Sequence, residues 1–257
     1  MKENTKAFLD TNILMGGLSS DLVLSSAEEP DYLYIPLWNS HVIKELRRHL
    51  PAKILEKHGD WNPQTATSSA EHRIRAMMRT FPGSMVNGWD AFMEEASGFV
   101  RDPDDTEILA GAIAGGADVL VTENVSDFNA KAIESSYGIE TIRESAFLIE
   151  MLHSDPSKMR RNLIRMVSGH GKPPTNLMEL CRRLSEIPEL SGFGQALEDR
   201  IRREYDMNVS MMFHRTGSGV QPRDRLGRFG RKTYPVSFDV LPPGTGYWGP
   251  DGNGPEF

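Results

Sequence analysis

The sequence predicts an α/β fold: a three-layer domain with a parallel central sheet, followed by a small all-α extension and a C-terminal tail. From residue 5 to about residue 150, short apolar runs alternate with amphipathic helical stretches, the order that a parallel sheet with crossover helices requires. The run at 118–122 is rich in valine and nearly all apolar, as expected for a strand that is buried on both faces. No strand pattern interrupts the helical segments after residue 153.

The individual elements follow from the spacing of apolar residues and from turn signals. Pro30 and Pro36 bound the second predicted strand, and Asp102 followed by Pro103 is a helix-start signal with the acid at the N-cap. In chain order the sequence predicts a strand at 7–9, a helix at 11–26, a strand at 32–35, helices at 39–50, 63–81, 89–97 and 102–116, strands at 118–122 and 139–142, and a helix at 145–152.

Composition divides the chain into three segments. Residues 1–153 are expected to form the α/β domain, and 13 basic against 24 acidic side chains in residues 1–150 make it acidic. Residues 154–207 are mildly basic, and prolines separate helices expected at 157–168, 175–185 and 193–204. Residues 208–257 are rich in Gly, Pro and Arg and have too little clustered apolar surface to offset the entropy of ordering, so we expect a disordered tail.

The overall composition excludes several classes of protein. No apolar run approaches the roughly 18–20 residues of a membrane span, and the charged N-terminus passes directly into a strand pattern without a secretory signal. A single cysteine, Cys181, excludes a disulfide framework, and a cytoplasmic location is expected. The net charge of −7 disfavours binding of nucleic acid by bulk charge, but it permits an enzyme that reaches a polyanion through metal ions held by carboxylates.

Four carboxylates are candidates for such a metal site. Asp10 and Asp127 follow predicted strands, and Glu45 and Asp105 lie on helices that would pack on the sheet. Ligand sites of parallel sheets lie beyond the carboxyl ends of the strands, where these four side chains would repel one another without a cation. Hard oxygen ligands in that number suit Mg²⁺ or Mn²⁺. Taken singly, Asp105 is better explained as a helix cap than as a ligand, and Glu45 can be a surface partner of Lys44 or Arg48.

The same residues carry a resemblance to a known family. The segment FLDTNIL, a helix that contains an EL pair after the second strand, and the stretch DPDDTEILAGAIAGGADVLVTENVSDF resemble PIN-domain ribonucleases over residues 6–150. The branch that is most similar is the VapC-like toxins of type II toxin–antitoxin pairs. The resemblance implies a metal-dependent endoribonuclease, with Mg²⁺ or Mn²⁺ held by Asp10, Glu45, Asp105 and Asp127, which are also its catalytic residues.

The resemblance also implies partners and has one departure. Where many family members have an aspartate, this chain has Asn124, so Asp127 would supply the missing charge, and Asn12, Thr122 and Asn124 would orient water or phosphate. The expected partners are an RNA substrate, an antitoxin that places a basic residue in the acidic cleft, and a second copy of the chain. Basic pairs outside the site would steer the RNA: Arg47-Arg48, Arg160-Arg161 or Arg182-Arg183.

Three other interpretations stay open at this point. Asn124 would suit a PIN-like module with a weakened metal site that only binds RNA or protein. A PIN nuclease with a housekeeping role, without an antitoxin, has the same motifs. The third is a phosphatase or nuclease of another α/β fold that uses Asp10 as its nucleophile, although no lysine or second acidic pair follows at a suitable strand end.

Overall fold

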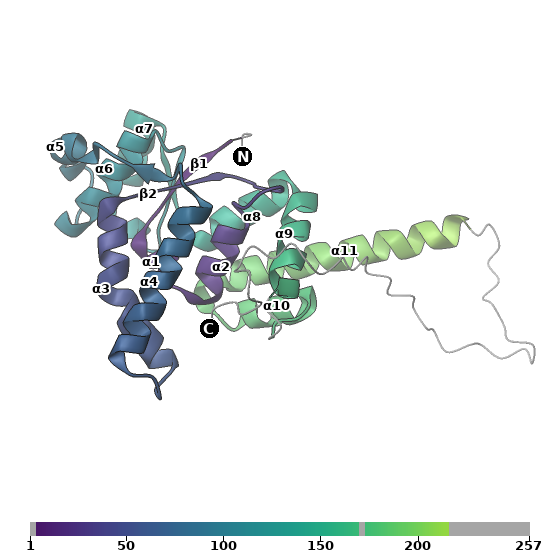
Figure 1. The fold of residues 1–257 in the computed structure, drawn as a ribbon. Coiled ribbons are helices and arrows are strands. Elements are labelled where there is room, and N and C mark those ends of the chain that lie inside the picture. Colours follow the sequence, from purple (N-terminus) through teal and green to yellow (C-terminus); the bar gives the residue numbers. More distant parts are fainter. Residues whose placement is uncertain (1–3, 170–172, 216–257) are drawn as a thin grey trace, which may run out of the picture.

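A computed structural model describes residues 4–169 and 173–215 of the chain (Figure 1). Its centre is a five-stranded sheet in the order β3-β2-β1-β4-β5, and every pair of neighbouring strands is parallel. The predicted α/β class and the parallel sheet are therefore confirmed. The strands are β1 (Lys6–Leu9), β2 (Ile35–Asn39), β3 (Met85–Val86), β4 (Val119–Val121) and β5 (Glu140–Ile142).

Helices surround this sheet and form the C-terminal region. The helices are α1 (Thr11–Leu14), α2 (Gly17–Ser25), α3 (Ser40–Lys57), α4 (Pro63–Thr80), α5 (Met93–Ser97), α6 (Thr106–Gly115), α7 (Ala130–Tyr137), α8 (Glu144–Ser154), α9 (Pro156–Gly169), α10 (Leu177–Ser185) and α11 (Ser191–Arg215). In Figure 1, α3 and α4 form a hairpin on one side of the molecule, and α8 to α11 gather on the other. Short 3₁₀ turns lie at Trp89–Phe92, Pro103–Asp105, Val125–Asp127 and Pro188–Leu190.

The predicted helix at 11–26 is divided in two, which corrects the sequence-based expectation. Gly16 and Gly17 have φ angles of 105° and 77°, in the left-handed region, so the chain turns there between α1 and α2. A Cβ atom at Gly16 would lie 2.9 Å from Nη1 of Arg73, so the turn also needs glycine for space. Apolar periodicity continues across the break because both short helices bury residues in the same core.

The second strand lies further along the chain than predicted: β2 begins at Ile35 and contains Pro36. A backbone N–H at position 36 would point away from β1. It would point towards β3, which pairs with β2 only from Trp38 onwards. The ladder therefore loses no hydrogen bond at Pro36, which is the condition under which a strand tolerates proline. The sequence predicts Pro36 as the boundary of the second strand, whereas in the structure Pro36 lies inside β2.

Other differences concern lengths and short elements. α3 continues past residue 50 through Pro51 to Lys57, because buried Leu50 and Ile54 on either side of the proline anchor it in the core. The two-residue strand β3 and helix α7 were not predicted. Except for α11, which ends eleven residues later than predicted, the remaining predicted strands and helices lie within a few residues of their expected positions.

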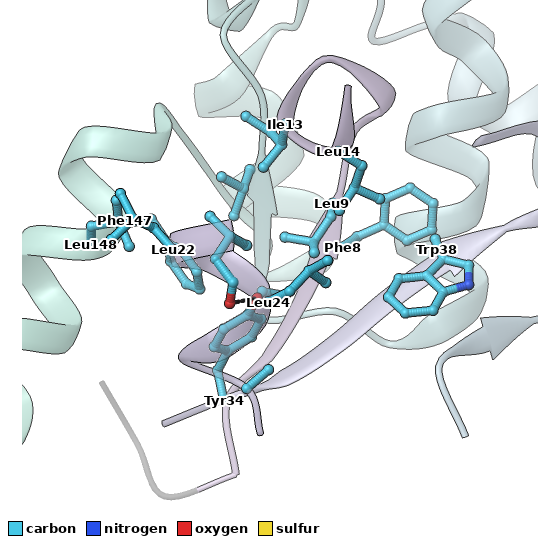
Figure 2. Packing of buried hydrophobic residues seen from close by; sticks show 14 of the residues in the cluster. Phe8, Leu9, Ile13, Leu14, Leu22, Leu24, Tyr34, Trp38, Phe147 and Leu148 are labelled. Carbon is cyan, nitrogen blue, oxygen red and sulfur yellow. Dashed lines mark hydrogen bonds between the residues drawn. The ribbon is translucent and has the colours of Figure 1, made fainter. Parts of the chain in front are cut away.

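One hydrophobic cluster joins the α/β part to the C-terminal helices. It extends from Phe8 and Trp38 in the sheet to Phe147 of α8 (Figure 2). The same cluster includes Phe193 and Leu197 of α11. Tyr34 meets the ring of Phe147 edge-on at 4.9 Å between centroids. The predicted boundary between residues 153 and 154 falls in the last turn of α8, a helix that contributes to this shared core.

The predicted tail begins within the last helix. α11 continues to Arg215 and projects from the body of the molecule in Figure 1, and residues 216–257 lie outside the described residues. None of the helices in the described part of the chain is both long and apolar enough to cross a membrane.

Replacing Gly111 with alanine is expected to destabilise the protein by about 2 kcal/mol. A Cβ at Gly111 of α6 would lie 2.5 Å from Cζ of Phe8 and 2.6 Å from Nδ2 of Asn39, and both neighbours are fully buried. Thermal unfolding measures the loss. The control is Gly98→Ala, where the nearest atom is 3.7 Å away and little change is expected. Equal melting temperatures for the two variants would contradict the tight packing of α6 on the sheet.

Candidate functional site

The site lies at the carboxyl ends of the two central strands. The backbone N–H of Asp10, directly after β1, donates to the carbonyl of Val121 in β4 at 3.1 Å, so the ends of these strands are adjacent. Thr122 follows β4 and is held against β5 in the same way. In parallel sheets, this is the edge at which ligands bind.

Asp10 is the central buried group of the site. Its side chain is 5 % exposed, and it accepts hydrogen bonds from the backbone N–H of Thr11 (2.5 Å), from Nδ2 of Asn12 (2.7 Å) and from the hydroxyl of Thr122 (2.6 Å). Burial raises the pKa of Asp10 above its ordinary value, although these three donors act in the opposite direction. The structure therefore fixes one carboxylate rigidly at the end of β1.

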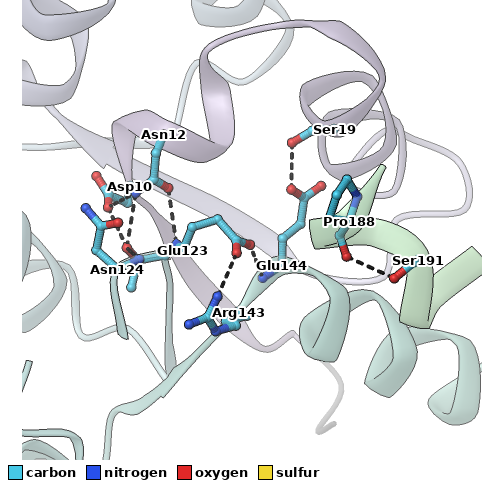
Figure 3. A network of polar contacts seen from close by, with 10 residues as sticks. Asp10, Asn12, Ser19, Glu123, Asn124, Arg143, Glu144, Pro188 and Ser191 are labelled. Carbon is cyan, nitrogen blue, oxygen red and sulfur yellow. Dashed lines mark hydrogen bonds and ion pairs between the residues drawn. The ribbon is translucent and has the colours of Figure 1, made fainter. Parts of the chain in front are cut away.

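The three residues expected to orient water or phosphate are close to Asp10, but two of them are bound to protein atoms. Nδ2 of Asn12 also lies 3.3 Å from the hydroxyl of Thr122, which in turn accepts the backbone N–H of Asn124 at 3.0 Å. Asn12 and Thr122 thus hold the carboxylate of Asp10. The side chain of Asn124 is exposed at the rim, beside Asp10 in Figure 3.

Asp105 approaches the same edge from the start of α6. Nδ2 of Asn39, at the end of β2, donates to the carbonyl of Glu107 at 2.7 Å and so fixes the first turn of this helix over the sheet. Partial burial raises the pKa of Asp105 to about 7, and the negative charges of Asp10, Asp102, Asp127 and Asp104 add to that rise. Asp10 and Asp127 therefore lie close enough to Asp105 to disfavour its negative charge.

Glu45 has partners of its own on α3. Its carboxylate lies 3.0 Å from Nε2 of His49 and 3.7 Å from Nη1 of Arg48, and its side chain is 21 % exposed. Its charge is not among those that raise the pKa of Asp105. The assignment of Glu45 as a metal ligand stays a prediction.

Sequence reasoning missed two residues that position the site. Asn39 caps α3 through Oδ1 while its Nδ2 fixes α6; an asparagine as the first residue of a predicted helix is the available signal. Glu123 connects the site to α8 (Figure 3): its backbone N–H lies 3.4 Å from Oδ1 of Asn12, and its carboxylate accepts the backbone N–H of Glu144 at 3.1 Å. No motif marks Glu123.

The donor set fits a hard divalent cation. Asp10, Asp105 and Asp127 present only oxygen atoms, and their mutual repulsion is the condition that a bound cation relieves. Within residues 4–169 and 173–215, no three acidic, histidine or cysteine side chains are already grouped as a complete metal cage. A cation here would therefore draw these carboxylates towards itself.

Fold and site together define a class of protein: a parallel α/β domain with a cluster of carboxylates at the carboxyl edge of its sheet. Residues 6–126 match the family model of the PIN domain. PIN domains are a family of nucleases. No curated protein and no solved structure matches the chain.

Proposed function

We propose that this protein is a metal-dependent endoribonuclease that hydrolyses RNA phosphodiesters at the carboxyl edge of its sheet. The observation that carries the proposal is the burial of Asp10 among three hydrogen-bond donors, next to the repelling charges of Asp105 and Asp127. A buried carboxylate of this kind destabilises the fold unless its charge is paired. A bound cation would pair with it and would also attract a polyanionic substrate.

Each residue of the site has a distinct role in this proposal. Asp10 and Asp105 would hold Mg²⁺ or Mn²⁺, with Asp127 as a further ligand and Glu45 as a ligand if it leaves His49. The bound ion would supply a nucleophile from water and neutralise charge on the phosphoryl oxygens. Asn12 and Thr122 keep the Asp10 carboxylate in one orientation, so little reorganisation precedes the reaction. The exposed amide of Asn124 would hydrogen-bond to water or to a phosphate at the rim.

The proposal includes inhibition by a partner, as in a toxin–antitoxin pair. The guanidinium group of an arginine can engage two carboxylates at once, and the described side chains that surround Asp105 offer it four aspartates. A housekeeping nuclease without such a partner would have the same site. A binding module with a weakened metal site would bind RNA without cutting it.

Metal dependence tests the enzymatic function directly. The full chain is expected to cleave single-stranded RNA with Mg²⁺ or Mn²⁺, to lose the activity in EDTA, and to regain it when the metal is restored. Denaturing gels of end-labelled RNA measure cleavage, and Asp105→Asn is the matched inactive variant. Binding of RNA without any metal-dependent product would favour the binding module instead.

A further inference from the structure

A second candidate site lies outside the acidic cluster, between the turn that joins α1 to α2, the C-terminal half of α3, and α4. It is a cavity of about 340 Å³. Met15, Leu50 and Ile54 give it an apolar floor, and its charged side chains are Lys53, Lys57, Arg73 and Glu56. Cations outnumber the single carboxylate, in contrast to the carboxyl edge of the sheet.

Two of these cations have no ion-pair partner within the described part of the chain. Lys53 and Lys57 are exposed, and neither forms an ion pair there. Most of the basic residues that the sequence suggested for steering RNA are engaged with carboxylates: Arg47 with Glu71, Arg48 with Glu45, Arg160 with Glu204, Arg161 with Asp31, and Arg182 with Glu186. The positive charge that is available to a polyanion therefore includes the rim of this cavity.

The wall of the cavity is rigid. Arg73 is buried, donates to the hydroxyl of Ser20 at 2.9 Å and pairs with Asp21 at 3.4 Å. Gly16 leaves room for its guanidinium group, because any Cβ there would lie 2.9 Å from Nη1. The wall is therefore held in place by Arg73, and the two exposed lysines at the rim are the cations that an anionic chain could reach.

The cavity and the acidic site are connected along one helix. Glu45, His49 and Lys53 follow one another at four-residue intervals and so share a flank of α3. At 1.5 Å per residue, Lys53 lies about 12 Å along the helix axis from Glu45. A strand of a few nucleotides that enters the acidic site can therefore reach the cavity along this flank.

We propose that this cavity is a subsite for the backbone of a single-stranded RNA whose scissile phosphate lies in the acidic site. Lys53 and Lys57 would neutralise phosphates, and the apolar floor would take a ribose or base. RNA is favoured over an acidic peptide because the subsite lies on α3, whose capping residue Asn39 also holds the start of α6 at the acidic site. This inference rests on the proposed function.

The test uses full-length chains that all carry Asp10→Asn, so that RNA is bound and not cut. A labelled single-stranded RNA is titrated by fluorescence anisotropy at several salt concentrations, with and without Lys53→Gln and Lys57→Gln together. Both lysines are exposed, so the fold should persist. Loss of two phosphate contacts is expected to weaken binding several-fold and to reduce the slope of log K against log salt by about 1.4.

Two controls have opposite expectations. Arg200→Gln with Arg202→Gln removes the same charge from α11, where each arginine is bonded to a glutamate, and should leave affinity and slope unchanged. Glu56→Gln should tighten RNA binding, because it removes the one carboxylate of the cavity. An unchanged slope in the double lysine variant would overturn the subsite.

Two further results separate the proposals. Weaker binding of a polyglutamate peptide by the lysine variant, with unchanged RNA binding, would assign the cavity to an acidic protein segment and overturn the RNA subsite. If instead the lysine variant shows the reduced slope but the unsubstituted chain cleaves no RNA with any divalent metal, the subsite stands and the nuclease function fails.

Discussion

Asp10→Asn is expected to lower metal-dependent RNA cleavage by about 10³-fold or more, while the protein stays folded. The substitution keeps the size of the side chain and one oxygen to accept from Thr11, Asn12 or Thr122, but removes the charge that would hold the cation. The fold should tolerate it because burial already disfavours the charged form of Asp10. Single-turnover cleavage rates, with circular dichroism to verify folding, measure the effect.

Glu45→Gln is the informative companion to this variant. In the structure Glu45 is bonded to His49 and Arg48 on its own helix, so a smaller loss of cleavage than for Asp10→Asn is expected. An equally large loss would show that Glu45 leaves these partners and joins the metal ligands. Wild-type rates in Asp10→Asn would contradict the catalytic assignment as a whole.

Glu144→Gln is expected to stabilise the protein at alkaline pH, on the order of 2 kcal/mol, with little effect near pH 4.5. Glu144 is 2 % exposed, and one of its carboxylate oxygens has no hydrogen-bond partner among the described residues. Burial raises its pKa from 4.5 to about 7; the bond from Ser19 (2.6 Å) opposes this, and the charges of Glu123 and Glu189 add to it. A raised pKa in the folded state means that stability present below pH 4.5 is lost as the pH rises through about 7.

Thermal unfolding at pH 5 and pH 8.5 measures this effect. The melting temperature of the unsubstituted chain should fall relative to that of Glu144→Gln as the pH rises. Glu134→Gln, at an exposed position of α7, is the matched control and should show no such divergence. Parallel pH profiles for Glu144→Gln and the unsubstituted chain would mean that Glu144 is ionised in the folded protein even at low pH.

Features that depend on nearby residues could be predicted from the sequence, and features that depend on tertiary contacts could not. The buried strand before Thr122 and the cap at Asp102 were predicted because apolar runs and capping residues act locally. The break at Gly16 depends on the guanidinium group of Arg73, 57 positions later in the chain. The position of Pro36 inside β2 depends on where β3 begins, because β3 pairs with β2 only from Trp38 onwards.

The candidate site was predictable to a similar degree. Asp10 could be predicted because burying a carboxylate at the end of an apolar strand destabilises the fold unless the carboxylate has a partner. Thr122 and Asn12 were associated with it, but their role as partners of Asp10 requires the approach of β1 to β4. Glu123 could not be found, because its importance comes from contacts with Asn12 and Glu144 rather than from its neighbours in sequence.

The junction between α8 and α9 has a consequence for how this protein can be divided. A single residue, Asp155, separates the two helices, and the hydroxyl of Ser145 on α8 accepts the backbone N–H of Phe193 at 2.9 Å. The family match ends at residue 126, before β5 and before this junction. Excising the matched segment would remove β5, one of the two strands that pair with β4. It would also expose the apolar surface that α8 covers. The segment that matches the family is therefore shorter than the part of the chain that shares one hydrophobic core.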